Sequence, residues 1–383
     1  MPSRRDHTCD QFSLPSPPDP ESPHMKPVLR SLFVSLCCAA LSCSQSSPVA
    51  PTVSENVAAP SAALGTGDLG AGDIETGAAE SVGADGGSDT SLRRFRFVYG
   101  ATVTGLEPDT EARIWLPVAT TNSQQTVERT RVSVPGEYHD TMETQHGNHL
   151  IYFNAIANDE GAIPLEVEYE VQRKEVRMSA GDVTEEDRRV FLTSNRLVPT
   201  DGSVSARILA EIWPTGDAAD IARALYDAVG QHMRYDKPAG GQWGRGDSLW
   251  ACDSAHGNCT DFHSMFISLC RDHTVPAKFE MGFPIPTENG AGSVGGYHCW
   301  AMFSANEKWV PVDISEADKH PEMAEYYFGN LTSDRVTFTT GRDLELNPPQ
   351  AAGPVNFLVY PYVEVDGQPH SEFEKRFRYE DLP

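Results

Sequence analysis

The chain has 383 residues, and its 55 Asp and Glu outnumber its 30 Lys and Arg to give a formal net charge of −25. Nucleic acid and anionic membrane surfaces repel such a chain, so we expect neither as a main partner. The 31 Gly and 28 Pro residues exclude a collagen-like chain, and no apolar run reaches the ~18–20 residues of a membrane-spanning helix, which leaves a soluble, acidic protein of mixed α and β structure.

Residues 1–43 have the features of an upstream extension followed by an export signal. Translation could begin at Met25, where a short basic stretch precedes an apolar run at residues 31–41. Cys43 follows a small residue, as in the lipidation signals of bacterial lipoproteins. We therefore expect an exported lipoprotein of the bacterial cell envelope or periplasm that contacts the membrane only through a lipid on Cys43. The alternative is a plain secretory signal cleaved near Ser42.

Residues 44–92 are dominated by Ala, Gly, Ser, Pro and Thr, and they contain seven acids but no Lys or Arg. Such a segment buries too little apolar surface to offset the entropy lost on ordering. We expect it to be a disordered acidic linker without a catalytic role.

From residue 93 onwards, apolar and polar residues alternate, which is the pattern of half-buried β-strands. Five alternating runs, separated by turn-prone stretches, lie at residues 95–103, 112–116, 127–134, 149–153 and 165–173. Short strands at this spacing predict an antiparallel sandwich or sheet. We place a β-rich N-terminal domain at residues 93–195 and expect no reactive group in it.

A helix with a cysteine at its start is the first candidate functional element. After an amphipathic helix at residues 217–233 and a Gly-rich loop, Asn258 and Asp261 have the spacing of a capping box. Apolar residues then recur at helical intervals up to residue 270, which makes Cys259 the first residue of a helix. At that position, free N–H groups and the helix dipole favour a thiolate and can hold an oxyanion. Cys259 is therefore a candidate nucleophile, although a small residue packed at a helix start has the same pattern.

A predicted hairpin brings a histidine and an aspartate together. Residues 297–303 and 308–314 are both strand-like, and a natural turn joins them. If the hairpin is centred just after Ala305, His298 and Asp313 are direct cross-strand neighbours on one face. A carboxylate in that position can orient an imidazole. A core histidine and a strand-end cap are the alternatives for these two residues taken singly.

Three stretches, which carry Cys, His and Asp in that order, resemble the motifs of the transglutaminase-like superfamily with its papain-like core. They are Gly257-Asn-Cys-Thr-Asp-Phe-His263, Gly296-Tyr-His-Cys-Trp300 and Trp309-Val-Pro-Val-Asp-Ile-Ser315. The resemblance implies an α+β fold in which the Cys-bearing helix packs on an antiparallel sheet. It also implies Cys259 as the nucleophile, His298 as general base and acid, and Asp313 as the residue that orients the imidazole.

On this basis, we assign residues 200–345 to a transglutaminase-like catalytic domain. Residues 346–383 then form a C-terminal β tail that packs on this core, with a strand covering the catalytic sheet. Gln242 and Trp243 in the Gly-rich loop are the candidates for a side-chain N–H that holds an oxyanion. Either residue could instead be a loop anchor.

We expect acyl transfer on a protein or peptide substrate through a thioester on Cys259, as the resemblance implies. Hydrolysis is the favoured outcome, because water is in vast excess around an exported enzyme and no acidic site that would recruit an amine can be identified. Crosslinking of protein glutamine to an amine is the alternative. A binding or scaffolding module of the cell envelope, which uses the fold without catalysis, is a third interpretation. No cofactor is expected.

The cysteines and histidines near the helix start also allow a metal-binding interpretation. A C-x3-H-x2-C-x3-H pattern is formed by Cys252, His256, Cys259 and His263. The C-x2-C pair that is usual in zinc sites is missing, and the histidine and aspartate of the hairpin would remain unexplained. We therefore expect no metal.

Four cysteines lie in the folded part, and export would permit disulfides between them. A working Cys259 stays reduced, which leaves at most one bridge; a pair of Cys252 with Cys299 is one option that the sequence does not decide. Cys270 lies in the apolar stripe of the helix and is a core residue. Cys299 follows His298 on a strand, so we expect it on the opposite face and not as a second nucleophile.

Overall fold

The computed structural model describes residues 91–209, 213–288 and 290–383, which all lie in one compact unit of the chain. The expected export signal, Cys43 and nearly all of the expected linker lie outside the described residues. Within the described ranges, no helix is both long enough and apolar enough to cross a membrane.

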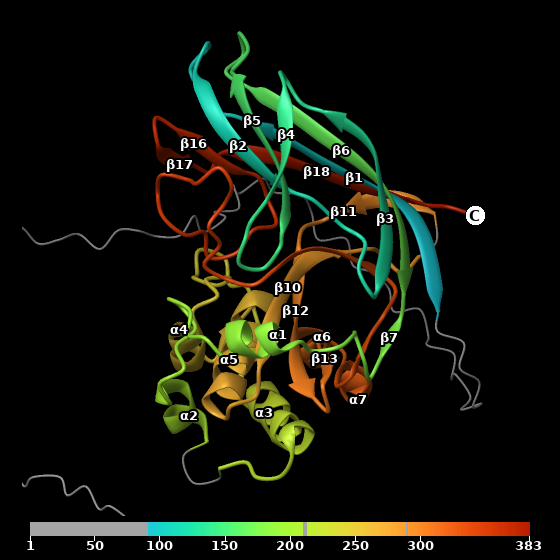
Figure 1. Cartoon of the computed structure of the whole chain (residues 1–383), viewed down its shortest axis with the longest axis vertical. Coiled ribbons are helices and arrows are strands. Elements are labelled where there is room, and N and C mark those ends of the chain that lie inside the picture. The colour runs from blue at the N-terminus through green and yellow to red at the C-terminus, as the bar shows by residue number, and fades with distance from the viewer. Residues whose placement is uncertain (1–90, 210–212, 289) are drawn as a thin grey trace, which may run out of the picture. The chain divides into compact units, whose positions relative to one another are not determined.

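The β-rich region is a sandwich of two five-stranded antiparallel sheets (Figure 1). Its strands are β1 (Leu92–Val103), β2 (Glu111–Pro117), β3 (Gln125–Ser133), β4 (Tyr138–Met142), β5 (His149–Ile156), β6 (Ile163–Lys174), β11 (Ala291–Val294), β16 (Tyr362–Val365), β17 (Gln368–His370) and β18 (Phe373–Asp381). One sheet has the order β11-β18-β1-β6-β3, and the other has the order β17-β16-β2-β5-β4. All five predicted strands are present, and the inward residues of both sheets share one hydrophobic core.

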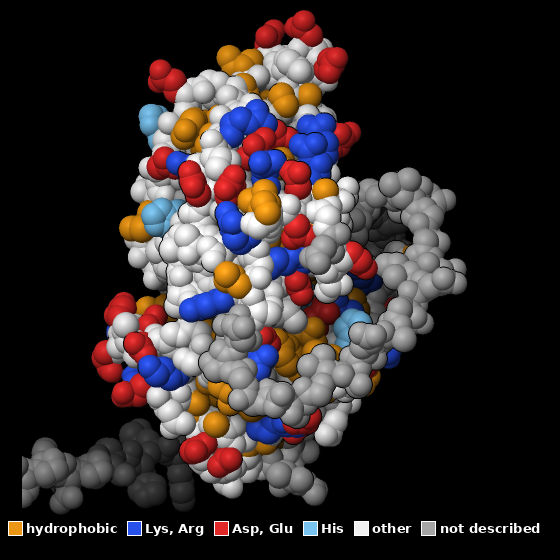
Figure 2. Space-filling model, turned by 90° about the vertical axis from the view of Figure 1, so that its right-hand side faces the viewer, with side chains coloured by type: hydrophobic (Ala, Val, Ile, Leu, Met, Phe, Trp, Pro, Cys, Tyr) orange, Lys and Arg blue, Asp and Glu red, His pale blue; other side chains and the backbone are white. Residues whose placement is uncertain are grey.

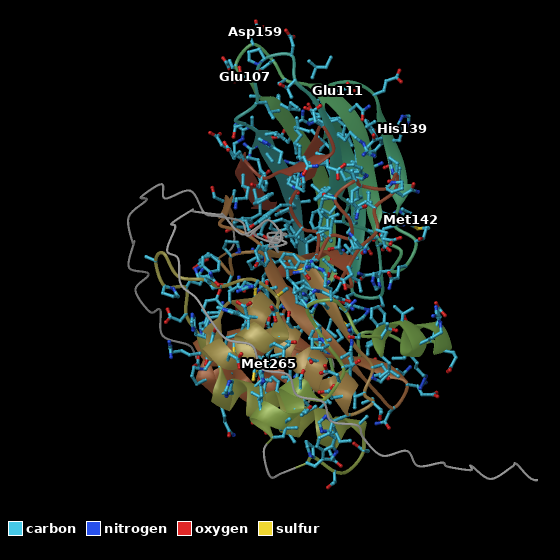
Figure 3. All side chains as sticks on the ribbon, turned by 90° about the vertical axis from the view of Figure 1, so that its left-hand side faces the viewer. Glu107, Glu111, His139, Met142, Asp159 and Met265 are labelled. Atoms are coloured by element: carbon cyan, nitrogen blue, oxygen red, sulfur yellow. The ribbon has the colours of Figure 1, made fainter. Side chains whose placement is uncertain are left out.

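Two strands of the sandwich outside the tail, β4 and β11, were not predicted from the sequence; β4 illustrates the reason. It forms the edge of its sheet, and residues such as His139 and Met142, which Figure 3 labels, are exposed. Because neither face of β4 is regularly buried, no alternation of apolar and polar residues marks it.

The outward residues of the sheet that contains β1 are charged, as expected for an antiparallel sheet with one solvated face. Arg131 contacts Glu168 at 2.7 Å, and Arg378 contacts Glu166 at 3.0 Å. Figure 2 shows Lys and Arg side chains interleaved with Asp and Glu on one face of the molecule. Exposed ion pairs contribute little to stability, so the sandwich depends on its apolar core.

The strands of the C-terminal tail pair within the sandwich, and the tail also packs on the catalytic sheet, where Phe357 and Phe377 contact Phe279 and Phe283 of β10 (Ala277–Pro284). β18 pairs with β1, and β16 pairs with β2 (Figure 1). β11, which comes from the middle of the catalytic segment, also pairs with β18. Burial explains this placement, because Phe377 of β18 is buried against Phe97 of β1 and Phe283 of β10. The β-rich region therefore does not end at residue 195.

The remaining part combines a four-stranded sheet with helices. The sheet consists of β13 (Lys308–Val312), β12 (His298–Ala305), β10 (Ala277–Pro284) and β15 (Arg335–Thr340), in that order. The helices are α1 (Glu185–Phe191), α2 (Ser203–Ile208), α3 (Ala218–His232), α4 (Ser248–Ser254), α5 (Cys259–Asp272), α6 (Ile314–Lys319) and α7 (Ala324–Tyr327), with a 3-10 turn at Pro321–Met323. Two short ladders pair β7 (Val176–Arg177) with β14 (Asn330–Leu331), and β8 (Arg234–Tyr235) with β9 (His256–Gly257).

The two predicted helices have closely matching bounds. α3 follows the N-cap Asp217, whose side chain accepts hydrogen bonds from two backbone N–H groups of the first turn. α5 begins at Cys259 and is buried along nearly its whole length, including Met265, which Figure 3 labels among the helices. Because α5 contacts β10 and β12 as well as α3 and α4, its first residue is held in a fixed position against the sheet.

The hairpin of β12 and β13 has a different register from the predicted one. Ala305 lies opposite Lys308, so the turn is the two-residue loop at 306–307. Both turn residues have positive φ values, 49° and 61°, as in the type I′ turn that suits the twist of a short hairpin. The predicted centre lies one residue too early, so His298 and Asp313 are not direct cross-strand partners.

Replacement of Phe377 by Ala tests the position of the tail. We expect Phe377→Ala to lower the free energy of unfolding by about 3–5 kcal/mol, because a buried aromatic side chain is lost and a cavity remains. The control Arg378→Ala, one residue along the strand on the exposed face, should change it by less than about 0.5 kcal/mol. Urea denaturation followed by circular dichroism measures both. Equal effects of the two substitutions would contradict the placement of β18 in the sandwich.

Candidate active site

A capping box fixes the start of α5. The Asn258 side chain accepts a hydrogen bond from Thr260 N at 3.0 Å, and Asp261 accepts one from Asn258 N at 3.1 Å. Cys259 is the first residue of the helix, as predicted, and it is buried. Its thiol therefore lies at the positive end of the helix dipole, where backbone N–H groups have no partner within the helix.

The Gly-rich loop is tied to the same helix start. Backbone N–H groups at residues 244 and 246 donate to the Asp261 carboxylate at 2.5 and 3.0 Å. This anchoring places Trp243 in the wall of the cavity beside Cys259. Gln242 is exposed and does not line that cavity, so the structure brings only one of the two oxyanion candidates to the site.

His298 and Asp313 are in contact. His298 is the first residue of β12, and Asp313 follows β13 as the N-cap of α6. His298 Nε2 lies 2.7 Å from Asp313 Oδ2, and both side chains are buried. Because the turn lies one residue later than predicted, the cross-strand partner of each residue changes by two positions. Side chains two residues apart on a strand point to the same face, so His298 and Asp313 still meet. With Nε2 engaged by the carboxylate, Nδ1 is the imidazole nitrogen left for Cys259.

The charges in the site favour an ion pair between Cys259 and His298. Burial lowers the pKa of His298, but the charge and hydrogen bond of Asp313, together with Cys259, outweigh burial and raise this pKa to about 10. Burial also raises the pKa of the Cys259 thiol, but its neighbours Cys299 and His298, and the positive charge of His298, hold it well below its usual value. At neutral pH, the site therefore holds a thiolate beside an imidazolium, the state that a cysteine nucleophile needs.

Arg335 is a residue of the site that the sequence did not reveal. It is buried on β15, and its Nη1 donates to Asp313 Oδ2 at 3.1 Å. The other carboxylate oxygen accepts from Ser315 Oγ at 3.1 Å and Glu316 N at 3.2 Å. Burial raises the pKa of Asp313, but His298 and then Arg335 hold it well below its usual value. Arg335 lies outside the three motifs, and only the order of strands in the sheet brings it to the carboxylate.

His263 lies one helical turn after Cys259 and contacts the same site. Its Nε2 accepts a hydrogen bond from Ile314 N at 3.1 Å and lies 3.8 Å from Asp313 Oδ1. Burial lowers the pKa of His263 to about 4, so its imidazole is neutral at physiological pH and carries its proton on Nδ1. The spacing of four residues from Cys259 was the one sequence signal for this position.

Cys299 lies closer to the nucleophile than expected. It does point to the face opposite His298, but α5 covers that face. Its Sγ lies 3.6 Å from His263 Nδ1 and 3.8 Å from Thr260 Oγ1, both on α5. Burial, together with Cys259, holds the pKa of Cys299 well above its usual value. Cys299 is therefore a neutral thiol beside the nucleophile, and its Sγ donates to Thr260 Oγ1.

The zinc pattern of the sequence does not come together in the described part of the chain. The one group of metal-ligating side chains found there comprises His298, Asp313 and Glu316. Its carboxylates are already paired, Asp313 with Arg335 and Glu316 with Lys319. The four described cysteines are all free, so Cys252 and Cys299 are not joined.

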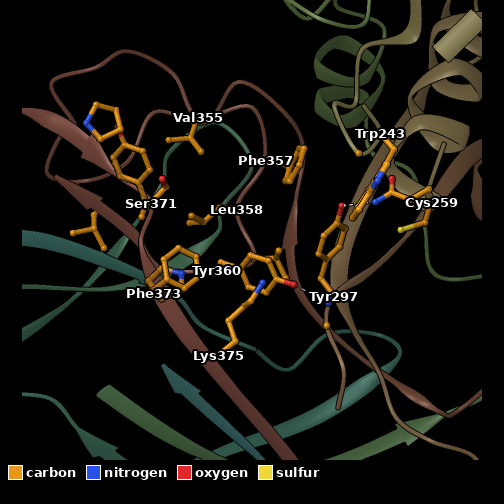
Figure 4. A pocket seen from close by; sticks show the side chains of 18 of the residues that line it. Trp243, Cys259, Tyr297, Val355, Phe357, Leu358, Tyr360, Ser371, Phe373 and Lys375 are labelled. Carbon is orange, nitrogen blue, oxygen red and sulfur yellow. Dashed lines mark hydrogen bonds between the residues drawn. The ribbon is translucent and has the colours of Figure 1, made fainter. Parts of the chain in front are cut away.

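A cavity of about 270 Å³ opens beside Cys259 (Figure 4). Trp243 and Tyr297 line it near the thiol, and the tail segment that leads into β16 lines it with Phe357 and Tyr360. The tail that completes the sandwich therefore also forms one wall of the candidate site.

Comparisons with known proteins agree with this geometry. Residues 207–314, which include Cys259, His298 and Asp313, match the transglutaminase-like superfamily. An uncharacterized protein of Haemophilus influenzae is 35% identical over 32% of this chain and 42% of its own length, so the match spans less than half of that relative.

Solved structures resemble a larger part of the chain. The crystal structure of a candidate cysteine protease from Cytophaga hutchinsonii aligns with a TM-score of 0.51 and 14% identity, over 76% of this chain and 92% of that one. The periplasmic domain of TgpA from Pseudomonas aeruginosa aligns with a TM-score of 0.30 and 15% identity, over 62% of this chain and 94% of that one. The chain therefore contains a transglutaminase-like core with a mixed α+β fold, accompanied by a β-rich N-terminal region.

Proposed function

We propose that the chain is a thiol-dependent acyl-transfer enzyme that hydrolyses peptide or amide bonds through a thioester on Cys259. One observation carries the proposal: a buried His298 contacts Asp313 at 2.7 Å, and its charge helps to hold the pKa of the helix-start thiol of Cys259 well below its usual value. This is the arrangement that nucleophilic cysteine catalysis uses, and the adjacent cavity gives a substrate access to the thiol. The fold shared with a candidate cysteine protease is consistent with the proposal.

The first half of the reaction forms the thioester. The Cys259 thiolate attacks the carbonyl carbon, and the negative charge that develops on oxygen is stabilised by N–H groups at the start of α5. The Trp243 indole N–H is a second donor. His298 then transfers its Nδ1 proton to the leaving nitrogen, the carbon–nitrogen bond breaks, and the amine product leaves.

The second half releases the acid. Neutral His298 takes a proton from water while the oxygen of that water bonds to the thioester carbon. Collapse of this intermediate breaks the carbon–sulfur bond, restores the Cys259 thiolate and leaves the imidazolium as at the start. Asp313 positions the imidazole and keeps its charged form favourable throughout, and Arg335 in turn positions Asp313.

Transfer to an amine instead of water is the second candidate outcome. An attacking lysine side chain would approach the thioester as a cation before it loses its proton. The described lining of the cavity contains Lys237 and Lys375 but no Asp or Glu, which disfavours the approach of a cation. We therefore propose water as the acceptor, with a protein or peptide as the substrate.

We further propose that the chain is exported and lipidated at Cys43. The proposal depends on the basic and apolar residues that precede Cys43 in the sequence. Intact-mass measurement on protein from bacterial envelopes should show a diacylated N-terminus at Cys43. Mature cytosolic protein that retains Met25 would contradict export, and an unmodified N-terminus near Ser42 would contradict lipidation alone.

Alkylation by iodoacetamide tests the ion pair. Because the pKa of Cys259 is held well below its usual value, its thiolate persists to a lower pH than that of an ordinary cysteine and is lost only below the lowered pKa. An ordinary thiol would hold roughly 75-fold less thiolate at pH 6 than at pH 8, so a clearly smaller fall in the alkylation rate of Cys259 over this range is the expected result. Peptide mapping by mass spectrometry separates Cys259 from the other cysteines.

Asp313→Asn is the matched variant for this experiment. It removes the negative charge that raises the pKa of His298, so the imidazolium becomes less stable and the pKa of Cys259 rises. We expect the alkylation profile of Asp313→Asn to shift to higher pH. An ordinary thiol profile in the unsubstituted protein would contradict the ion pair.

Turnover measurements test the mechanism. Incubation with glutaminyl and peptide substrate libraries, with and without a primary amine, should give hydrolysis products that mass spectrometry detects. Cys259→Ala should abolish them, and Asp313→Ala should lower kcat by about 10²–10⁴-fold while changing KM much less. Amine incorporation that exceeds hydrolysis would contradict the choice of water, and undiminished turnover by Cys259→Ala would contradict the thioester. If no substrate reacts and Cys259 also shows an ordinary thiol profile, a binding or scaffolding role is favoured.

A further inference from the structure

The cavity beside Cys259 continues along a row of aromatic side chains towards β18 (Figure 4). Tyr297 OH is 2.9 Å from Asn258 Nδ2, so this ring is anchored to the start of α5. Tyr297 N donates to Tyr360 OH at 3.2 Å, and the two rings lie edge to face with centroids 5.6 Å apart. Lys375 Nζ in turn lies 4.5 Å from the centroid of the Tyr360 ring. The wall of the groove thus leads from the thiol to a lysine.

The charge of this groove is opposite to that of the chain. The chain has a net charge of −25, yet the described residues that line the groove include Lys237 and Lys375 and no Asp or Glu. Neither lysine forms an ion pair with a described residue, whereas Lys278, Lys308 and Lys319 each contact a carboxylate. In an acidic protein, a groove with two cations and no counter-charge is electrostatically complementary to an anion.

The position of Lys375 on its strand also breaks the local pattern. Along β18, residues 373, 375, 377 and 379 face inward, and the other three are Phe373, Phe377 and Tyr379. An apolar residue would continue this row, but a lysine stands there, partly buried, with Tyr360 and Phe373 as its nearest rings. Burial lowers the pKa of Lys375, because no carboxylate offsets the loss of hydration. The faces of the two rings offset part of the free energy that is lost when the ammonium group leaves water, and an anionic ligand would offset more of it.

We propose that the groove binds an extended acidic peptide, with an apolar or aromatic side chain against Tyr360 and Phe357 and a carboxylate of the peptide paired with Lys375. This inference rests on the proposed function, because it names the substrate class of the same site. The alternative is that Lys375 only covers the two rings that it contacts. That alternative predicts no preference between a charged peptide and its neutral analogue.

Binding to the full chain that carries Cys259→Ala tests the proposal without any turnover. The probes are two fluorescein-labelled hexapeptides, one of alternating Phe and Glu and the other of alternating Phe and Gln, and fluorescence anisotropy measures their Kd. We expect the Glu peptide to bind about three- to tenfold more tightly at low salt, with the preference falling at high salt. When Lys375→Met is combined with Cys259→Ala, the preference for the Glu peptide should disappear. Lys375→Arg in the same background should retain that preference.

Arg376→Met is the matched control. It removes one positive charge from the next residue of β18, which points to the exposed face and donates to Thr102 Oγ1 at 2.6 Å. The preference should survive this substitution, and thermal melts should show that both Met variants fold. Equal binding of the two peptides, binding of neither, or a preference that survives Lys375→Met would overturn the proposal. Acidic-peptide binding without hydrolysis by the unsubstituted chain would instead contradict the proposed function and leave the groove as a binding site.

Discussion

The buried carboxylate of Asp313 joins elements that are distant in the sequence. It accepts hydrogen bonds from His298 on β12, from Arg335 on β15 and from the first turn of α6. A charge taken out of water costs several kcal/mol unless opposite charges and hydrogen-bond donors surround it. The order of strands in the sheet supplies those partners, because it places the ends of β12, β13 and β15 close to one point. With a different order of strands, the buried carboxylate would lack the partners that offset its loss of hydration, and it would not contact His298.

The charge of Asp313 is passed on to the thiol in two steps. It keeps the His298 imidazole protonated against the effect of burial, and the imidazolium then keeps the Cys259 sulfur ionised. The second step also depends on the capping box, because Asn258 and Asp261 make Cys259 the first residue of α5. The reactive pair therefore needs one feature that is local in the sequence and one that is not.

The difference between features that are local in the sequence and features that are not explains how much of the site could be predicted. The helix start was predicted, because a capping box and an apolar stripe lie within a dozen residues of Cys259. The contact of His298 with Asp313 was predicted with a wrong register, because the loop at 306–307 closes the hairpin one residue later than the most turn-like stretch suggested. A side chain keeps its face after a shift of two residues, so the error did not separate the pair.

What the sequence did not predict depends on the sheet and on packing between distant segments. Arg335 belongs to a strand with no motif of its own, and Cys299 becomes a neighbour of Cys259 only because α5 covers that face of β12. The pairing partners of the tail strands were not predicted for a similar reason, since an alternating strand can pair with any open sheet edge. Hydrophobic alternation indicates that a strand exists but does not indicate its partner.

The tail links the stability of the sandwich to the chemistry of the site. β18 carries Phe377 into the core between β1 and β10 and, two residues earlier on the same face, Lys375 into the groove that starts at Cys259. A single strand is therefore held rigidly by its pairing with β1 and presents a cation at a fixed position on one wall. A specificity group on such a strand loses little entropy when a ligand binds, because the strand is already ordered. If the groove binds substrate as we propose, changes in the β-rich region alter which substrates reach the thiol without touching Cys259, His298 or Asp313.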